Sequence, residues 1–341
     1  MGKANSHTAP QKTFSPGPIV DLGYERHQAI IKANHYNNFS NIPYAVPPLH
    51  DLRFSKPLPI NSTSSQINDG SIGHICPQAH SDWTRDAALL VALYTLGLIN
   101  NIDPSHLIPN PFQDVPAEWE SVDCLLLDVV VPEGVAEALE GDDDFVPHDT
   151  SNGLYVQALA LNWVSKHISK FGGGPDRVTV IGESAGASSI LHLITSYGED
   201  SSEPNSDSLP GAPFQHAILQ SPAFFPVTNA NTERQVYEEF LYAADADTFE
   251  ELEVKSSNEL IAANKFLISK SPYAQFTFGP TLDTAFVPKP VSILLKDGDF
   301  WNDIDGIMVA HNSLEGLLLR ISKQWKIMTH LQNLYEEVYQ V

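Results

Sequence analysis

The stretch that decides the fold is Arg177-Val178-Thr179-Val180-Ile181-Gly182-Glu183-Ser184-Ala185-Gly186. Its first half is a short run rich in β-branched residues, which is typical of a strand. The residues after it, Ala187 to Thr195, are predicted to continue as a helix. Gly182, Ser184 and Gly186 form a G-x-S-x-G motif between the two elements. The order strand, motif, helix predicts a tight turn that carries a serine at its tip.

Such a turn is the arrangement of a nucleophile elbow in the α/β-hydrolase class. A side chain at Gly182 or Gly186 is expected to collide with the neighbouring helix or strand. The turn directs the Ser184 hydroxyl above the sheet. It also points the backbone N–H of Ala185, at the helix N-terminus, toward developing negative charge. The alternative interpretation is an ordinary Gly-rich turn between a strand and a helix.

Further elements are predicted on both sides of the elbow. The run Leu125 to Val131 consists almost entirely of Leu and Val and predicts a buried strand. The segment Glu133 to Ser151 contains two glycines, a proline and an Asp run, and is predicted to be a loop. The other predicted elements are a helix at 84–99, an amphipathic helix at 154–168, a strand at 217–219, mostly helix at 232–268 and a strand at 307–310. Residues 1–18 are predicted to be a flexible tail, followed by one domain over 19–341.

Composition limits the possible partners and leaves the redox state open. The chain has 341 residues, with 19 Lys and Arg against 42 Asp and Glu, which gives a formal net charge of −23. A surface this acidic repels phosphate backbones, so nucleic acid is not expected as a partner. The longest apolar run, Ala87 to Ile99, is too short for a transmembrane span. The two cysteines, Cys76 and Cys124, could be free thiols or one disulfide.

Four segments stand out beside the elements above. They are Phe171-Gly172-Gly173-Gly174-Pro175-Asp176 with the elbow after it, Asp123-Cys124-Leu125-Leu126-Leu127-Asp128-Val129-Val130-Val131-Pro132, Ile42-Pro43-Tyr44-Ala45-Val46-Pro47-Pro48 and Leu52-Arg53-Phe54. Together these segments resemble the type-B carboxylesterases, a family that includes cholinesterases and fungal lipases. The resemblance implies an α/β-hydrolase fold, with a central, mostly parallel sheet flanked by helices. It also implies a serine carboxylic-ester hydrolase that acts on small-molecule or lipid esters, with no cofactor and no metal.

The resemblance also assigns roles to single residues. The run Ile307 to Gly316 is similar to the family's acid segment, which makes Glu315 the acid that partners Ser184. Cys76 and Cys124 match the family's first disulfide bridge. Glu183 belongs to the elbow between Gly182 and Ser184. The apolar stretch Ala87 to Ile99 is similar in position to a lid over the site, although plain core packing is an equal alternative.

Two parts of the family's catalytic machinery are not found. The Gly-rich oxyanion loop and a strand on each side of it should lie between Pro132 and Asn152, but this interval contains no Gly-Gly pair. We therefore predict a sheet that is incomplete at this point, with Ala185 as the remaining oxyanion donor. The catalytic histidine should follow Glu315, where the sequence has only His330, in a predicted amphipathic helix over 323–340.

His311 and His216 are predicted to be structural or surface residues. Loss of an oxyanion donor raises the barrier by roughly 3 to 4 kcal/mol, and loss of the histidine lowers turnover on the order of a million-fold. The sequence therefore predicts negligible ester turnover by this chain. The alternatives are a non-catalytic binding or adhesion module on the same fold, and a fragment that does not fold. A further departure is Val122, where the family usually has a Glu that pairs with the arginine at the position of Arg53.

Overall fold

The computed structural model describes residues 16–32, 36–71, 73–81, 83–84, 96–98, 119–132, 152–196, 212–223, 230–272, 275–283 and 286–313. The strands are β1 (Pro16–Asp21), β2 (Arg26–Lys32), β3 (Tyr36–Pro43), β4 (Ile67–Asn68), β5 (Leu126–Pro132), β6 (Thr179–Glu183), β7 (His216–Gln220) and β8 (Gly306–Ala310). The helices are α2 (Asn152–His167), α3 (Ala185–Thr195), α4 (Ala230–Ala243), α5 (Phe249–Val254), α6 (Ser257–Ser269) and α7 (Val291–Asp297), with two 3-10 turns, η1 (His50–Leu52) and η3 (Ile168–Phe171).

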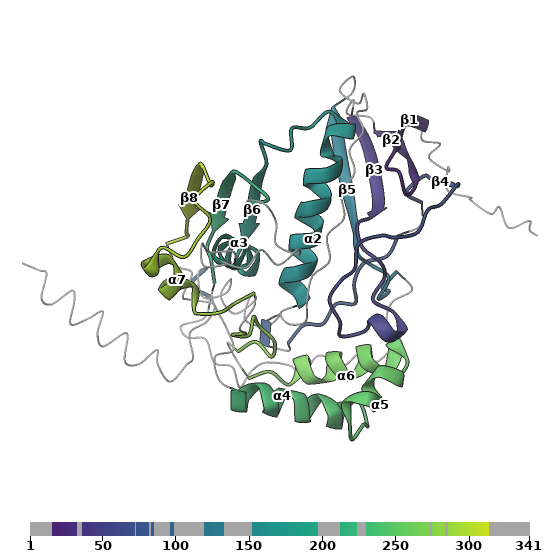
Figure 1. The fold of residues 1–341 in the computed structure, drawn as a ribbon. Helices are drawn as coiled ribbons and strands as arrows, with labels where there is room; N and C mark the ends of the chain where they lie inside the picture. Colours follow the sequence, from purple (N-terminus) through teal and green to yellow (C-terminus); the bar gives the residue numbers. More distant parts are fainter. Residues whose placement is uncertain are drawn as a thin grey trace, which may run out of the picture.

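The described strands form two sheets rather than one (Figure 1). The first has the order β1-β2-β3-β5, with β4 beside β2, and its neighbours are antiparallel except for β2 and β4. Short connections account for the antiparallel pairing of β1, β2 and β3, because strands joined by a few residues can pair only antiparallel. The second sheet, β6-β7-β8, is parallel throughout. The predicted mostly parallel sheet is therefore found only in the second sheet.

The break between the two sheets lies at the predicted position. Among the described strands, β5 pairs only with β3, and β6 pairs only with β7. In the sequence, the interval 133–151, which lacks the Gly-rich loop, lies between β5 and α2, the helix that precedes β6. An intact sheet of eight strands would have contradicted the prediction of an incomplete sheet, and the two separate sheets confirm it.

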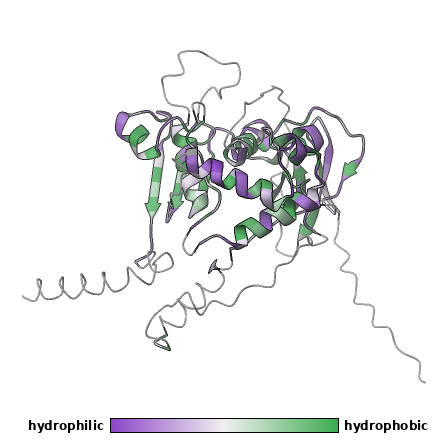
Figure 2. Cartoon of the chain, turned by 90° about the horizontal axis from the view of Figure 1, so that it is seen from below, coloured by the Kyte–Doolittle hydropathy of each residue, from purple (hydrophilic) through white to green (hydrophobic). Residues whose placement is uncertain are grey.

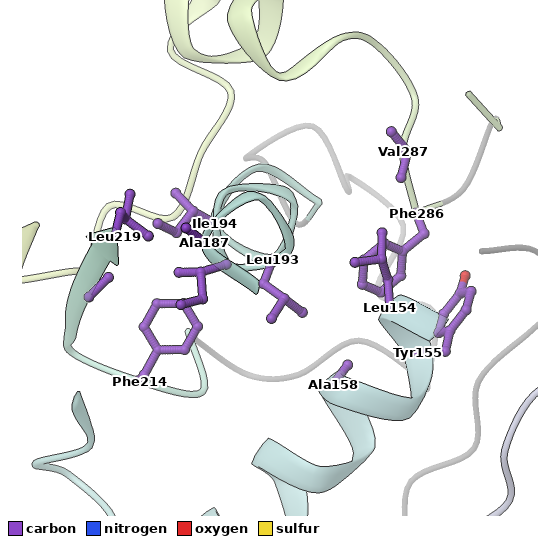
Figure 3. Close-up of a cluster of buried hydrophobic side chains, with 12 residues drawn as sticks. Leu154, Tyr155, Ala158, Ala187, Leu193, Ile194, Phe214, Leu219, Phe286 and Val287 are labelled. Atoms are coloured by element: carbon purple, nitrogen blue, oxygen red, sulfur yellow. The ribbon is translucent and has the colours of Figure 1, made fainter. Parts of the chain in front are cut away.

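Helix α2 connects the two halves through its side chains. Near its start, Leu154 and Ala158 belong to the core that also contains residues of α3 and β7 (Figure 3). Near its end, Trp163 belongs to a second core with Phe39 of β3 and Phe171. Figure 1 shows α2 between the two groups of strands. Burial of apolar side chains on one helix thus holds together two sheets that no described strand pairing connects.

One consequence of the break is exposed apolar surface on the strands. Parallel sheets normally have both faces covered. Here Ile181 of β6 is 64% exposed and Met308 of β8 is 57% exposed, while Val130 of β5 is 59% exposed. The described residues therefore lack a complete covering layer over these strands.

Most predicted elements are confirmed, with shifted bounds. The strand at 125–131 is β5, the helix at 154–168 is α2, and the segment 232–268 consists of three helices, α4, α5 and α6. The predicted tail at 1–18 is three residues too long, because β1 begins at Pro16 and pairs with β2; residues 1–15 lie outside the described ranges. The predicted loop at 133–151 and most of the predicted helix at 84–99 also lie outside them. Within the described ranges, no helix is long and apolar enough to cross a membrane.

Candidate active site

The elbow has formed around Ser184 as the sequence predicts. Ser184 connects β6 to α3 and has φ 54° and ψ −116°. A positive φ is rare for a residue other than glycine and costs about 1–3 kcal/mol. Two backbone hydrogen bonds hold the turn: Ser184 donates its N–H to the Gln220 carbonyl at 2.9 Å, and Ala223 donates its N–H to the Ser184 carbonyl at 3.3 Å. The strained conformation is thus fixed by the end of the neighbouring strand β7.

The two motif glycines differ in how closely the chain approaches them. A Cβ on Gly182 would lie 2.6 Å from the carbonyl carbon of Gly186 and 2.8 Å from the Ala187 nitrogen. The tight contact predicted at Gly182 is therefore confirmed. At Gly186 the prediction is wrong, because a Cβ there would meet nothing within 4 Å. The reason is its position on the exposed side of the first turn of α3.

The Ser184 hydroxyl is not used by the fold. Ser184 is the N-cap of α3, but its side chain makes no capping hydrogen bond. The side chains of Ser184 and Ala185 are exposed. The N–H of Ala185 belongs to the first turn of an 11-residue helix, where the helix dipole is positive. This geometry presents a free hydroxyl beside a backbone donor, as a nucleophile and an oxyanion donor require.

Sequence reasoning missed a second serine that supports the turn. Ser188 is buried one helical turn after Ser184. Its hydroxyl lies 2.6 Å from the carbonyl oxygen of Ala223 and 3.2 Å from that of Ser184. The hydroxyl thus connects α3 to the chain that leaves β7. A small hydroxyl residue on the buried face of the helix was the only sequence signal for this role.

The ends of the three parallel strands form a row beside the elbow. Glu183 pairs in register with Gln220, which pairs with Ala310. The next residues are therefore Ser184, Ser221 and His311. Adjacent strands lie about 4.8 Å apart, so the His311 backbone is roughly 10 Å from that of Ser184. In the structure, His311 is exposed and its Nδ1 lies 3.2 Å from the Asn312 carbonyl. Among the described residues, no hydrogen bond joins His311 to Ser184.

Two other described histidines near this sheet also lie away from Ser184. His216 is the first residue of β7 and is opposite Thr179, at the other end of β6 from Ser184. Like His311, it is a surface residue, as predicted. His192 is buried on α3, eight residues after Ser184 in the sequence, which is about 12 Å along a helix. Burial lowers the pKa of His192, so the neutral ring is favoured.

Glu315 and His330 lie outside the described residues, and their roles stay predictions. The same holds for the lid, because only residues 96–98 of the stretch 87–99 are described.

The predicted disulfide is present. Cys76 and Cys124 are joined, with their Cα atoms 5.1 Å apart. Backbone hydrogen bonds join the two chain segments next to the bridge. The N–H of Ile75 donates to the Trp119 carbonyl, and the N–H of Ser121 donates to the Ile75 carbonyl, both at 3.0 Å. The bridge thus closes the long excursion between residues 76 and 124 at the edge of the first sheet.

A strained serine between a parallel strand and a helix, with the hydroxyl free and a helix N-terminus beside it, defines a site of the α/β-hydrolase class. Comparison with known proteins identifies the family. The model described as "Carboxylesterase family" matches residues 22–143 and 150–338. The chain belongs to this family.

Relatives and solved structures agree with this assignment. The carboxylesterase patB of Penicillium expansum is 32% identical over 378 residues, which cover 89% of this chain and 65% of the relative. Lipase 1 of Geotrichum candidum is 29% identical over 332 residues, covering 77% of this chain and 57% of the lipase. A solved structure titled thermophylic PNB esterase aligns with a TM-score of 0.62 at 23% identity, covering 89% of this chain and 65% of that chain, and shows the same fold. The chain thus spans less than two thirds of the length of these proteins.

The comparisons also agree with an internal loss of sequence. The match to patB is 378 positions long and covers 89% of the 341 residues of this chain, about 303 residues, so about 75 positions of the relative (378 minus 303) have no counterpart here. The family match is interrupted between residues 143 and 150. This interruption falls between β5 and α2, where the sheet is broken.

Proposed function

We propose that this chain is a carboxylic-ester hydrolase by descent, with Ser184 as nucleophile, Glu315 as acid and small-molecule or lipid esters as its substrate class. The observation that supports the proposal most is the formed elbow. Its strained serine carries a hydroxyl that no hydrogen bond of the helix cap engages. A fold that needed only a tight turn here would place glycine at a positive φ, since glycine adopts it without strain.

The same geometry supports slow turnover by this chain. Acyl transfer needs a base that takes the serine proton and donors that bind the oxyanion. Among the described histidines, the backbones of His311 and His192 are each about 10 Å or more from that of Ser184 by strand and helix spacing. The Ala185 N–H would be a single oxyanion donor, because the interval 133–151 contains no Gly-rich loop. Ser184 would therefore remain a protonated alcohol with little nucleophilicity.

A second candidate is a non-catalytic binding module on this fold. The open elbow favours it, because Ser184, Ala185 and Gly186 are all exposed rather than enclosed by a pocket. In this case Ser184 would have no chemical role, and its conformation would be a remnant of the family's turn.

Chemical rescue separates the two candidates. The chain is incubated with a fluorophosphonate, with and without imidazole as an external base, and adducts are mapped by peptide mass spectrometry. If Ser184 is the nucleophile, its oxygen attacks phosphorus, the P–F bond breaks, fluoride leaves and imidazole accepts the serine proton. We expect an adduct on Ser184 whose rate of formation increases with imidazole concentration, because the exposed site admits the base.

Ser184→Ala and Ser189→Ala are the matched controls. Ser189 lies in the same helix, and its hydroxyl donates to the Ala185 carbonyl at 2.9 Å. The first variant should lose the imidazole-dependent adduct and the second should keep it. An unlabelled Ser184 at all imidazole concentrations, in a folded protein, would favour the binding module and end the hydrolase proposal.

A further inference from the structure

A cavity away from the elbow has the properties of a ligand site. It has a volume of about 680 Å³ and lies between α4, the α5–α6 region, the segment 48–54 and the segment 277–281. In Figure 1, α4, α5 and α6 form a group of their own below the start of α2. None of the described residues that line the cavity belongs to β6 or α3. We call it the α4–α6 cavity.

The interior of the α4–α6 cavity is apolar, and its edge is aromatic. Leu252 and Ile261 are buried and form part of its floor. Four aromatic side chains that line it are partly exposed, between 40% and 48%: Phe54, Tyr237, Phe249 and Phe278. Figure 2, a view from this side, shows hydrophobic segments alternating with hydrophilic ones along the helices. Four partly exposed aromatic rings around one cavity indicate a ligand-binding surface.

One of these rings is held in an uncommon backbone conformation. Phe54 has φ 58°, which is rare for a bulky residue. The Asn152 side chain donates to its carbonyl at 2.8 Å, and its ring lies 5.4 Å from that of Phe249. Strained residues of this kind cluster at ligand sites, where the surrounding structure fixes them. The aromatic edge is thus arranged before any ligand binds.

The charges on the cavity wall decide the class of ligand. Arg53 lines the cavity, but its guanidinium donates to the Glu253 carbonyl at 3.1 Å, to the Lys255 carbonyl and to Ser257 Oγ at 2.9 Å. Val122, at the position where the resemblance leads one to expect an acidic partner for this arginine, is an apolar part of the wall. The guanidinium is therefore held at the α5–α6 junction by neutral acceptors, and it remains a positive charge on the described wall, with the apolar Val122 where the resemblance leads one to expect a carboxylate.

A carboxylate on the described wall balances the charge of Arg53. Glu233 lies in the first turn of α4 and is exposed. With one glutamate against one arginine on the described wall, the cavity has no excess positive charge, and the net charge of −23 of the chain repels anionic ligands such as free fatty acids. A cavity of this size matches a drug-sized molecule, for which pockets of about 300–1,000 Å³ are usual. We infer that the α4–α6 cavity binds a neutral aromatic small molecule, independently of any reaction at Ser184.

The test is a fluorescence titration of the full chain with N-phenyl-1-naphthylamine, a neutral aromatic probe. We expect saturable binding with one site per chain. Tyr237→Glu should weaken it at least about tenfold, because a carboxylate at the apolar edge opposes burial of a neutral ring. The matched control is Tyr242→Glu, on the same helix, 84% exposed and not part of the cavity wall. It should bind as the wild type does.

A second matched pair probes the interior. Val122→Glu should weaken probe binding at least about tenfold. Val254→Glu, at an 83% exposed position of α5, should not. Ser184→Ala should leave binding unchanged. Non-saturable binding, equal effects within each pair, or loss of binding in Ser184→Ala would each overturn the inference. Circular dichroism identifies variants that fail to fold. If Val122→Glu is one of them, the surface pair at Tyr237 and Tyr242 decides the outcome.

Discussion

Removal of the disulfide is expected to lower the free energy of unfolding by about 4 kcal/mol. The bridge between Cys76 and Cys124 spans a sequence separation of 48 residues, and closing a loop of this length restricts the unfolded chain strongly. The closed segment is also fixed to the rest of the protein. Trp83 donates its indole N–H to the Gln275 carbonyl at 3.1 Å, and Glu120 forms an ion pair with Lys265 of α6 at 3.0 Å.

The measurement is urea unfolding of the wild type, with and without reductant, beside the double variant Cys76→Ala, Cys124→Ala. The chain has two cysteines in all, so reduction affects this bridge alone. The reduced wild type and the double variant should unfold at the same, lower urea concentration. Coincident unfolding of the oxidised and reduced wild type would show that the bridge contributes nothing to stability.

A methyl group at Gly182 is expected to destabilise the protein by roughly 3 kcal/mol. The added Cβ would lie 2.6 Å from the backbone of Gly186, and backbone cannot give way as a flexible side chain can. Gly186→Ala is the matched control, because a Cβ there meets nothing within 4 Å. Alanine should be neutral there, or slightly stabilising because it favours helix.

Thermal or urea unfolding of the two variants measures the difference between their free energies of unfolding. Gly182→Ala should also slow the imidazole-dependent labelling of Ser184, because the elbow must shift to admit the methyl group. Equal stability of Gly182→Ala and Gly186→Ala would mean that the tight approach in the elbow is not present in solution.

Local patterns in the sequence predicted the elements and the elbow well. The run of Leu and Val at 125–131 and the β-branched residues before Gly182 specify strands almost by themselves. The break in the sheet followed from the short interval between Pro132 and Asn152. The antiparallel pairing of β1, β2 and β3 was not predicted, because it depends on the short connections between these strands rather than on their composition. Strand β1 was not fully predicted either. Pro16 and Gly17 at its start are uncommon in strands, although β1 pairs with β2.

The α4–α6 cavity could not be predicted from the sequence. The residues that form its wall come from positions as far apart as Pro48 and Thr281, and no local pattern connects them. The sequence did contain one sign of it. Val122 is a departure from the resemblance, but two of the three acceptors of Arg53 are the backbone carbonyls of Glu253 and Lys255, which carry no sequence signal; the third is the Ser257 hydroxyl. The support that Ser188 gives to the elbow was missed for a similar reason, since its acceptors are also backbone carbonyls.

We propose, as the central point, that this chain carries a formed elbow but lacks the base and the further oxyanion donors that turnover needs. The most direct test is the steady-state hydrolysis of p-nitrophenyl butyrate by the purified chain and by its Ser184→Ala variant, without imidazole. The claim predicts rates that agree within about twofold, since loss of the base alone lowers turnover on the order of a million-fold. A wild-type rate typical of esterases, abolished by Ser184→Ala, would contradict it and would show that a base reaches Ser184; His330 and His311 would then be the first residues to replace.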